Sequence, residues 1–416
     1  MDQNSLLLKL TDDFTLNLRR RPAYSSKLLL RTSGKGGVFA YEYVSGSRYN
    51  DKLFQDDEQM ASVVLEQNGK TYVRGIIGEE LRIKPLLTME RSAEGVVPHL
   101  LYRGDSADCY TPLKDYIPAV PMSPEDVQPA RGIKAAPDER SDLKIDPEVH
   151  VVLDSAYLRS YSYNVTEIIF YFGAVLNAVN LRYKTIKPMQ VKIHIVGFTF
   201  NAHDEDEPYI KQFARTAHND ISGTLYGFST HYRTHEAQLF QQVDILTLVS
   251  GRDFCTVLNR RMECKVSGMG YIGGACGEWR TSIGEDIAWS FNAVRTMAHE
   301  LGHMLGCVHD GEPPNRALPG HPGARECPGN WGYIMSYVRE TPKEYHFSPC
   351  CIAQIEYLAR LSSRSCLSQN NTRKEVARSN KLPGFITTWR KICSTTKASG
   401  GITYTYNWDK ESHRCW

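Results

Sequence analysis

The chain has 416 residues, 41% of them hydrophobic, and a formal net charge of +2. This length is enough for two or three domains with apolar cores. The nearly balanced charge gives no reason to expect a nucleic acid or a strongly acidic partner. Since no apolar run reaches the length of a membrane span, we expect no transmembrane segment.

The amino terminus, MDQNSLLLKLTDDF, has neither the basic start nor the apolar core of a signal peptide. The cysteines and two N-glycosylation acceptor sequences, at Asn164 and Asn370, nevertheless indicate an extracellular protein. Asn164 also suits the N-cap of a helix. We therefore expect a secreted monomer, and a chain that is a fragment lacking its first residues.

Residues 1–103 contain several runs typical of β-strands, and the step Asn68-Gly69 is typical of a tight hairpin. This region is predicted to be mostly β. Residues 104–146, hereafter the linker, are rich in Pro, Asp and Ser and have no periodic apolar pattern. We expect the linker to be exposed and open to proteolytic cleavage.

Residues 147–368 alternate between strand and helix patterns, which predicts an α/β domain. Its predicted elements are a strand over 149–154, helices over 164–183 and about 222–242, a strand near 243–250 and a long helix over 285–306. Trp289, Val294 and Met297 are candidates for the buried face of the last helix. Beyond Gly306 the regular pattern fades into an irregular, cysteine-rich part.

The end of the long helix carries the residues of a zinc site. Residues 299–309 read HELGHMLGCVH, with the spacing H-E-x-x-H-x-x-G-x-x-H. His299 and His303 lie one helical turn apart, so both imidazoles can bind one ion. Gly306 allows the turn that brings His309 round as the third ligand. Three protein ligands leave the fourth position for water, which is typical of a catalytic zinc.

Glu300 stands beside the first histidine and can act as the general base for the zinc-bound water. Zinc lowers the pKa of such a water from about 15.7 towards about 7. The residues therefore predict a zinc hydrolase with one catalytic zinc, and most simply a peptidase. Glu300→Gln should then keep the zinc and the fold but lose activity.

The segment YIMSY (333–337) contains a methionine downstream of the third histidine. The long zinc motif with such a methionine turn resembles the metzincins, which implies that Met335 lies beneath the three imidazoles. Tyr337 resembles a tyrosine that approaches zinc in astacin-like enzymes, and the alternative is a wall residue of the substrate cleft.

Asp310, directly after the third histidine, and the segment GMGYIGGACG (268–277) resemble the reprolysin (adamalysin) branch, most of all the reprolysin-like metalloproteases of tick saliva. The resemblance implies a β prodomain (1–103), an activation region (104–146), a metzincin catalytic domain (147–368) with an irregular lower lobe, and a partial cysteine-rich region (373–416). It also implies a latent zymogen that cleaves host plasma or matrix proteins such as fibrinogen, fibrin or fibronectin. Substrate would lie antiparallel along the strand near residues 270–273.

Eleven cysteines include eight between residues 255 and 366, enough for four disulfides in one domain. Cys255 and Cys264 are close enough to pair, and the resemblance implies a pair between Cys276 and Cys366. Cys109, upstream, is a candidate cysteine switch that occupies the fourth position of the zinc as a thiolate. An ordinary free cysteine, or one paired with a residue outside the fragment, is the alternative.

By position, Glu148 and Asp244 match carboxylates that bind a structural calcium in reprolysins, and Gln369 or Asn370 could complete that site. Ordinary surface acids are the alternative. His321 and His346 are expected at the surface.

The rival function is a catalytically silent or adhesive protein on the same fold. Such a protein would use the tripeptide Arg103-Gly104-Asp105 or the carboxyl-terminal tail. A plain turn is the alternative for the tripeptide.

Overall fold

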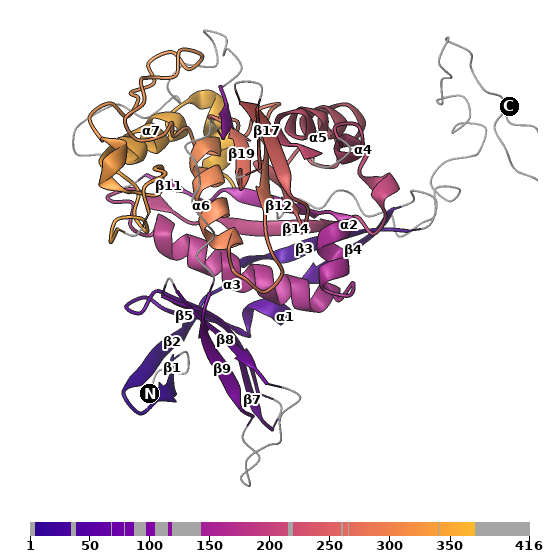
Figure 1. Ribbon diagram of the computed structural model, residues 1–416, viewed down its shortest axis with the longest axis vertical. Helices are drawn as coiled ribbons and strands as arrows, with labels where there is room; N and C mark the ends of the chain where they lie inside the picture. Colours follow the sequence, from indigo (N-terminus) through magenta and orange to yellow (C-terminus); the bar gives the residue numbers. More distant parts are fainter. Residues whose placement is uncertain are drawn as a thin grey trace, which may run out of the picture. The chain divides into compact units, whose positions relative to one another are not determined.

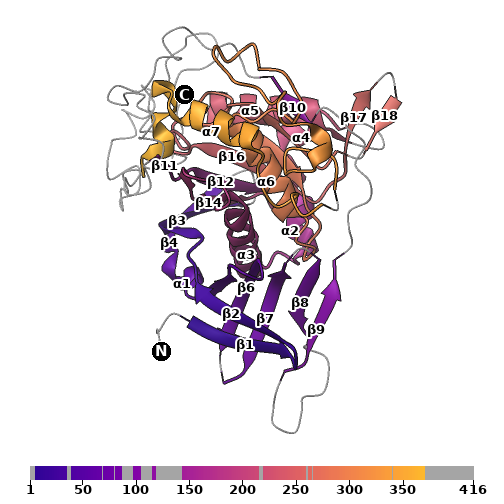
Figure 2. The same ribbon diagram turned by 90° about the vertical axis from the view of Figure 1, so that its left-hand side faces the viewer.

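The computed structural model describes residues 5–34, 39–67, 69–78, 80–86, 97–104, 115–118, 143–214, 219–258, 261–264, 266–339 and 341–370. These residues belong to one compact unit, and the tail from Arg373 onward is a separate unit outside the described residues. Cys109 and Asp105 also lie outside the described residues. Two large β-sheets with helices between and around them make up the fold (Figures 1 and 2).

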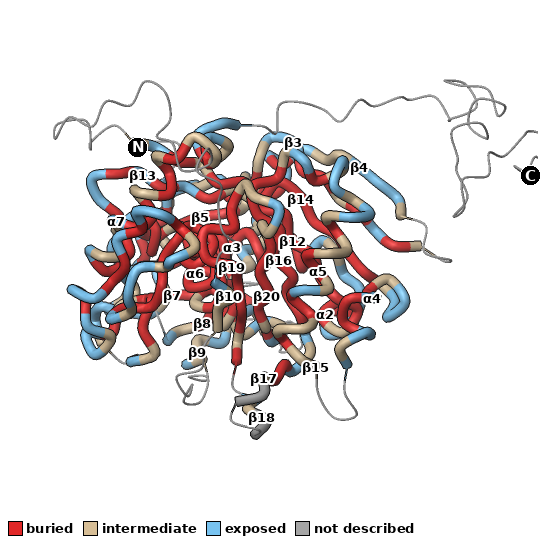
Figure 3. The backbone as a smooth tube through the Cα atoms, turned by 90° about the horizontal axis from the view of Figure 1, so that it is seen from above, coloured by how far each residue is buried: buried red, intermediate tan, exposed pale blue. Residues whose placement is uncertain are grey.

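The larger sheet contains β3 (Tyr24–Ser33), β4 (Phe39–Ser45), β10 (Tyr116–Ile117), β12 (Glu148–Leu153), β14 (His194–Phe200), β16 (Ile245–Ser250), β19 (Gly268–Tyr271) and β20 (Thr281–Glu285). Their order across the sheet is β10-β19-β20-β16-β12-β14-β3-β4. The middle strands pair in parallel, with Val149 opposite Ile245, whereas β19 runs antiparallel to β20. All residues of β12 and β16 are buried, as expected for parallel strands covered on both faces (Figure 3).

The second sheet is formed by the amino-terminal region and is antiparallel throughout. Its strands are β1 (Ser5–Thr11), β2 (Phe14–Arg20), β5 (Leu53–Asp56), β6 (Ala61–Gln67), β7 (Thr71–Ile77), β8 (Leu81–Pro85) and β9 (His99–Arg103). Gly69 has a φ of 70° between β6 and β7, the left-handed conformation that the predicted hairpin needs.

The smaller strands are β11 (Lys144–Ile145), β13 (Gln190–Val191), β15 (Asn219–Asp220), β17 (Phe254–Leu258) and β18 (Arg261–Glu263). The helices are α1 (Ser47–Asn50), α2 (Ser155–Ser160), α3 (Val165–Tyr183), α4 (Pro208–Lys211), α5 (Ile221–His235), α6 (Ala293–Met304) and α7 (Pro349–Ala359). Short 3-10 turns cover Asp204–Asp206, Gly329–Trp331 and Ser362–Ser368. Within the described part of the chain, no helix has the length and apolarity that a bilayer crossing requires.

Helix α3 begins where the sequence predicts, because the Asn164 side chain accepts a hydrogen bond from the Glu167 N–H at 3.2 Å. Helix α5 ends earlier than predicted, at His235 rather than near residue 242. Glu236, directly after it, is tied to Arg31 of β3, and the chain then turns towards β16.

The predicted start of the active-site helix at residue 285 is wrong, since α6 begins at Ala293. Trp289 and Phe291 have positive φ values of 67° and 61°, which no helix contains. The Tyr161 hydroxyl accepts from the Trp289 N–H at 3.2 Å, and the Tyr171 hydroxyl accepts from the Phe291 N–H at 2.9 Å. These buried hydroxyls replace helical partners, so the loop is stable without a helix. Trp289 is 37% exposed and does not belong to the buried face, whereas Val294 and Met297 do.

Helix α3 lies between the two sheets and holds them together. The Gln55 side chain donates to the carbonyl oxygen of Asn177, and the Ser62 hydroxyl donates to that of Ala174 at 2.7 Å. A Cβ on Gly173 would lie 2.7 Å from the Leu53 side chain. The amino-terminal sheet therefore shares one apolar core with the α/β part.

Strands β3 and β4 leave the amino-terminal sheet and join the larger one (Figure 2). β3 pairs in parallel with β14, with Leu29 opposite Gly197 and Leu30 opposite Phe198. The boundary predicted near residue 103 thus separates two regions of sequence but not two independent sheets.

Four disulfides join the predicted eight cysteines, and both proposed pairs are confirmed. The bonds are Cys255–Cys264, Cys276–Cys366, Cys307–Cys351 and Cys327–Cys350. The last two bonds stabilise the irregular lower part beyond α6.

Candidate active site

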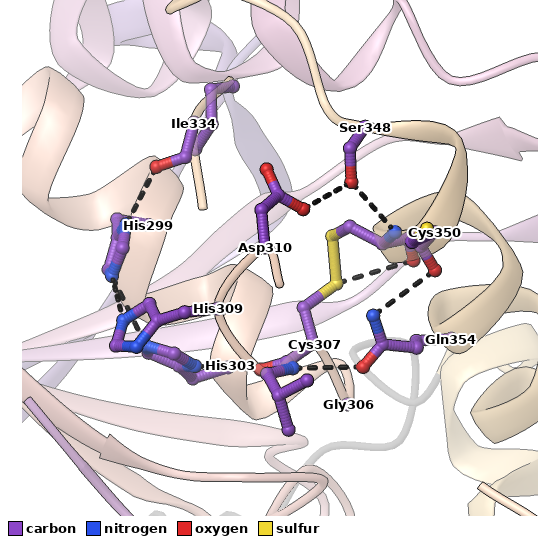
Figure 4. The surroundings of a disulfide bond; sticks show 12 residues. His299, His303, Gly306, Cys307, His309, Asp310, Ile334, Ser348, Cys350 and Gln354 are labelled. Atoms are coloured by element: carbon purple, nitrogen blue, oxygen red, sulfur yellow. Dashed lines mark hydrogen bonds between the residues drawn. A yellow bond between two sulfur atoms is a disulfide. The ribbon is translucent and has the colours of Figure 1, made fainter. Parts of the chain in front are cut away.

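Helix α6 and the turn after it bring the three predicted histidines together (Figure 4). His299 and His303 stand one turn apart on α6, and their Nε2 atoms are 3.1 Å apart. Gly306 has a φ of 107°, so the chain turns sharply after the helix. His309 then places its Nε2 atom 3.3 Å from that of His299.

The outer nitrogens of the imidazoles fix which ring nitrogen carries the proton. His299 Nδ1 donates to the carbonyl oxygen of Ile334 at 2.8 Å, and His303 Nδ1 donates to that of Cys307 at 2.7 Å. The Nε2 lone pairs of these two rings therefore point at each other rather than at a proton donor. In a tetrahedral site with Zn–N bonds of about 2.0–2.1 Å, the nitrogens would be about 3.3 Å apart. The residues present fit zinc.

A carboxylate from the linker lies against all three imidazoles. Asp115 places one side-chain oxygen 2.7 Å from His309 Nε2 and 3.4 Å from His303 Nε2, and the other oxygen 3.3 Å from His299 Nε2. Its side chain is only 13% exposed, so the prediction of an exposed linker is wrong at this residue. Burial would raise the pKa of Asp115, but His309 and His299 outweigh burial and hold it well below its usual value.

The residues around Asp115 pair with the strand at the active-site edge of the sheet. Strand β10 runs parallel to β19, with Tyr116 opposite Gly270. The Gly270 N–H donates to the Asp115 carbonyl oxygen at 3.4 Å, and the Ile272 N–H donates to that of Ile117 at 3.1 Å. The linker therefore occupies the backbone donors of the edge strand.

Glu300 is 2% exposed and lies against β19. An ideal Cβ on Gly268 would come within 2.5 Å of Glu300 Oε1, and one on Gly270 within 3.4 Å of Oε2. Burial, and then the charge of Asp115, raise the pKa of Glu300 well above its usual value. This carboxyl group thus lies beside the triad in a water-poor position suited to proton transfer.

Met335 packs against the active-site helix, and Tyr337 lies against His309. Met335 is fully buried, and its sulfur would lie 2.7 Å from a Cβ on Gly302 of α6. The Tyr337 ring centroid is 4.7 Å from that of His309, and Tyr337 lines the adjoining cavity. This position agrees with a wall residue of the cleft.

The cavity beside the triad has a volume of about 30 Å³ and lies between α6 and the segment after Met335. His299 and Glu300 line it on the side of the helix, and Ser336 lines it on the other side. Two basic residues, Arg295 and Arg339, also line it. Sequence reasoning did not single out these arginines.

The other candidate residues are the two possible calcium ligands and the two glycosylation sites. Glu148 and Asp244 are 2% and 1% exposed, and Asp244 accepts from the Glu148 N–H at 2.9 Å. They are therefore not surface acids, and burial followed by the Glu148 charge raises the pKa of Asp244 to about 7. The Asn164 and Asn370 side chains are exposed, as glycosylation requires.

His321 is buried rather than at the surface, so that prediction is wrong. Its Nε2 atom lies 2.8 Å from the Gly306 carbonyl oxygen, and its Nδ1 accepts from the Asn315 N–H at 3.1 Å. It therefore supports the turn that positions His309. His346 is exposed, as predicted.

Comparison with known proteins agrees with this geometry. Residues 147–348 match the reprolysin group of Metallo-peptidase family M12. This part of the chain is a reprolysin-type metallopeptidase domain. Its activity is that of a zinc metalloendopeptidase.

Relatives extend the match beyond the domain. The venom metalloproteinase antarease of Tityus serrulatus is 27% identical over 354 residues, which cover 83% of this chain and 87% of that protein. A venom metalloproteinase of Olivierus martensii is 24% identical and covers 74% of each chain. A disintegrin-and-metalloproteinase-like protein with thrombospondin motifs from Bombyx mori is 25% identical over 91% of this chain but only 55% of its own length.

The metalloproteinase-II of Bacteroides fragilis aligns with a TM-score of 0.43 and 12% identity, over 88% of this chain and 91% of that one. The sequence-based assignment to the reprolysins is confirmed by the family match. The special similarity to tick enzymes stays a prediction.

Proposed function

We propose that the protein is a secreted zinc endopeptidase made as a latent zymogen, with His299, His303 and His309 as zinc ligands and Glu300 as the general base. One observation carries this proposal. Three buried imidazoles converge with their Nε2 atoms 3.1–3.3 Å apart for the two measured pairs, and a buried carboxyl group lies beside them.

Zinc bound by these histidines would supply Lewis acidity and make a water nucleophilic at neutral pH. The chain itself supplies the other parts of the reaction. The Gly270 and Ile272 N–H groups of the edge strand would bind an antiparallel substrate backbone. Glu300 would take the proton of the attacking water and pass it to the leaving amine. Met335 packs against Gly302 of α6, next to the ligand His303.

Latency is supported by the position of the linker. Asp115 to Ile117 lie where substrate would bind, so the intact chain is expected to be inactive until the linker is cut and displaced. The venom relatives support secretion and an extracellular target. By its resemblance to tick enzymes, we assign host plasma or matrix proteins, such as fibrinogen, fibrin or fibronectin, as the substrates.

Cleavage of fibrinogen and gelatin tests the proposal, with the chain assayed before and after limited proteolysis of the linker. Activity should appear on linker cleavage and vanish when a chelator removes the metal. Glu300→Gln should lower kcat by about 10²- to 10⁴-fold, because the proton acceptor is lost while the shape of the side chain is preserved.

The control is metal content, since Glu300→Gln should bind zinc as well as the unchanged chain does. Full activity in that variant would contradict the role of Glu300. Silence of the cut, zinc-loaded chain on every protein tried would favour the rival reading as a binding protein.

We also propose a structural calcium held by Glu148 and Asp244. Both carboxylates are buried at adjacent strand starts, where a divalent cation would offset two charges in a poorly solvated place. Calcium titration by calorimetry, with Asp244→Asn beside the unchanged chain, decides this. Equal heats in both proteins would exclude the site.

A further inference from the structure

The Asp115 carboxylate stands where a fourth zinc ligand would stand. It lies 2.7–3.4 Å from the Nε2 atoms of all three histidines. Its Oδ1 atom is buried and makes its closest polar contact, at 2.7 Å, with His309 Nε2. Since Nδ1 carries the proton in His299 and His303, lone pairs of Asp115 and of these imidazoles face one another. A cation between them would relieve that repulsion.

We propose that Asp115 is the fourth zinc ligand of the intact chain and thereby the residue that keeps the proposed endopeptidase latent. The role foreseen for the cysteine Cys109 thus belongs to a carboxylate six positions further along. A carboxylate oxygen is an ordinary zinc ligand, and it would fill the position that the catalytic water needs.

The neighbours of Asp115 hold it in place. The Tyr116 hydroxyl donates to Glu312 at 2.6 Å, and the Tyr116 ring packs 5.1–5.2 Å from the rings of His303 and His309. Ile117 packs against the apolar cluster that contains Tyr271 and Met269. The contacts of Tyr116 and Ile117 therefore fix β10 and hold Asp115 against the histidines.

Strand direction explains why the blocking segment is not itself a substrate. β10 runs parallel to β19, whereas the proposed substrate runs antiparallel. With the chain reversed, a side-chain carboxylate faces the histidines in place of a peptide carbonyl. The segment binds as a strand but presents no bond to cleave.

The test uses the full-length, uncut chain loaded with Co²⁺ or Zn²⁺ and needs no activity measurement. Asp115→Asn is compared with Asp12→Asn, at an acidic residue of the amino-terminal sheet whose side chain is 95% exposed. The visible absorption of the cobalt protein should change in Asp115→Asn and stay unchanged in Asp12→Asn. Acetohydroxamic acid should bind the zinc form of Asp115→Asn about 100-fold more tightly than the unchanged chain, because the site is no longer occupied.

Cleavage of the linker should bring the unchanged chain to the hydroxamate affinity of Asp115→Asn. Asp115→Glu keeps a carboxylate and should bind the probe with intermediate affinity, which separates ligation from a general loosening of the fold. Identical cobalt spectra and probe affinities in all variants would overturn the proposal. These readouts do not depend on peptidase activity. If the cobalt spectrum and the hydroxamate affinity change in Asp115→Asn but the cleaved chain has no peptidase activity, the proposed function is refuted and Asp115 remains a zinc ligand.

A second feature, the cavity that Arg295 and Arg339 line together with Glu300 and Asp115, bears on substrate choice. Arg295 precedes His299 by one turn of α6, so both side chains face the same side. Its guanidinium donates to the Ser336 carbonyl oxygen at 3.0 Å, which fixes it between α6 and the segment after Met335. Arg339 lines the same cavity.

From this arrangement we infer that the cavity binds an acidic side chain, Asp or Glu, next to the scissile bond of the substrate. A guanidinium group matches a carboxylate in shape and charge, and both arginines are half-buried, which strengthens that pairing relative to an exposed one. This inference rests on the proposed endopeptidase activity.

The measurement is kcat/KM of the linker-cleaved enzyme on peptides that differ only at the two residues flanking the scissile bond. An acidic residue at one of these positions should exceed Leu by about 10- to 100-fold. Arg339→Gln and Arg295→Lys should reduce that ratio. Arg325→Gln, an exposed arginine that does not line the cavity, should keep it.

The ratio cancels any general loss of activity, so it reports specificity alone. A preference for Leu at both positions, or a ratio that Arg339→Gln leaves unchanged, would overturn the inference while the peptidase stands. Failure to cleave any peptide would remove the proposed function and this inference together.

Discussion

Gly268 leaves room for the Glu300 side chain because glycine has no Cβ. It lies on β19, and a Cβ there would meet three atoms of the Glu300 side chain within 2.5–2.8 Å. Real Cβ atoms do not approach so closely, so Glu300 would have to move. Gly270, two residues on, would come no nearer than 3.4 Å.

We therefore expect Gly268→Ala to lower kcat of the activated enzyme by about 10- to 100-fold, because the general base is displaced from the triad. Gly270→Ala should cost much less. Metal content and thermal unfolding, measured beside kcat, should stay close to those of the unchanged chain. A larger loss in Gly270→Ala than in Gly268→Ala would contradict this positioning role.

At this scale the sequence predicts the ligands well and their surroundings poorly. The spacing from His299 to His309 is local, so it identifies the triad without a structure. Asp115 is separated from His299 by more than 180 residues, and no local pattern marks it. In the sequence Arg295 is an ordinary helical residue, and only the structure shows its hydrogen bond to Ser336.

At the scale of elements, the active-site helix is a case in which the apolar periodicity of the sequence predicts the wrong helix start. Apolar spacing extends the predicted helix back to residue 285, but the chain from Asp286 to Asn292 forms a loop. Asp286 accepts from the Ala293 N–H at 2.9 Å and from the Tyr157 hydroxyl at 2.7 Å, and so anchors the true start of α6. Tyr157 comes from a distant segment, and only the folded chain brings it to Asp286.

Because burial raises the pKa of Asp286 to about 6, its contribution depends on pH. A buried acid with a raised pKa favours the folded state below its unfolded value, near 3.9, and loses that contribution as pH rises through about 6. Asp286→Asn cannot titrate, so the difference in unfolding free energy between pH 4 and pH 7 should be smaller in the variant. Denaturant unfolding at both pH values measures it, and an unchanged difference would contradict this assignment.

At the scale of the whole molecule, the amino-terminal region is a structural part of the fold and does not only block the active site. It supplies β3 and β4 to one end of the larger sheet, and the linker that follows it supplies β10 to the other. Its side chains bond to backbone carbonyls of α3 and enter the same apolar core. The sequence predicts β-strands in this region, but it cannot predict which sheet they join, because strand pairing across such distances leaves no periodic signal.

This shared core predicts that cutting the linker does not by itself release the amino-terminal fragment. The two pieces should co-elute in gel filtration and separate only in denaturant. Leu53→Ala, at a fully buried residue, should weaken the association by about 2–5 kcal/mol, since a cavity would form against α3. Leu7→Ala, at a residue that is 72% exposed, should leave it unchanged. Two separate peaks from the cut, otherwise unchanged protein would contradict the prediction.

The pairing of β3 with β14 has a consequence for the fate of the enzyme once its amino-terminal fragment is lost. β14 reads HIVGFTF, and all its residues except His194 are buried. Without β3, its N–H and C=O groups would form an unpaired apolar edge, the kind of surface that adds strands from other molecules. Strands β3 and β4 thus also protect the β14 edge from aggregation. An enzyme that has lost its amino-terminal fragment would aggregate and be short-lived in solution.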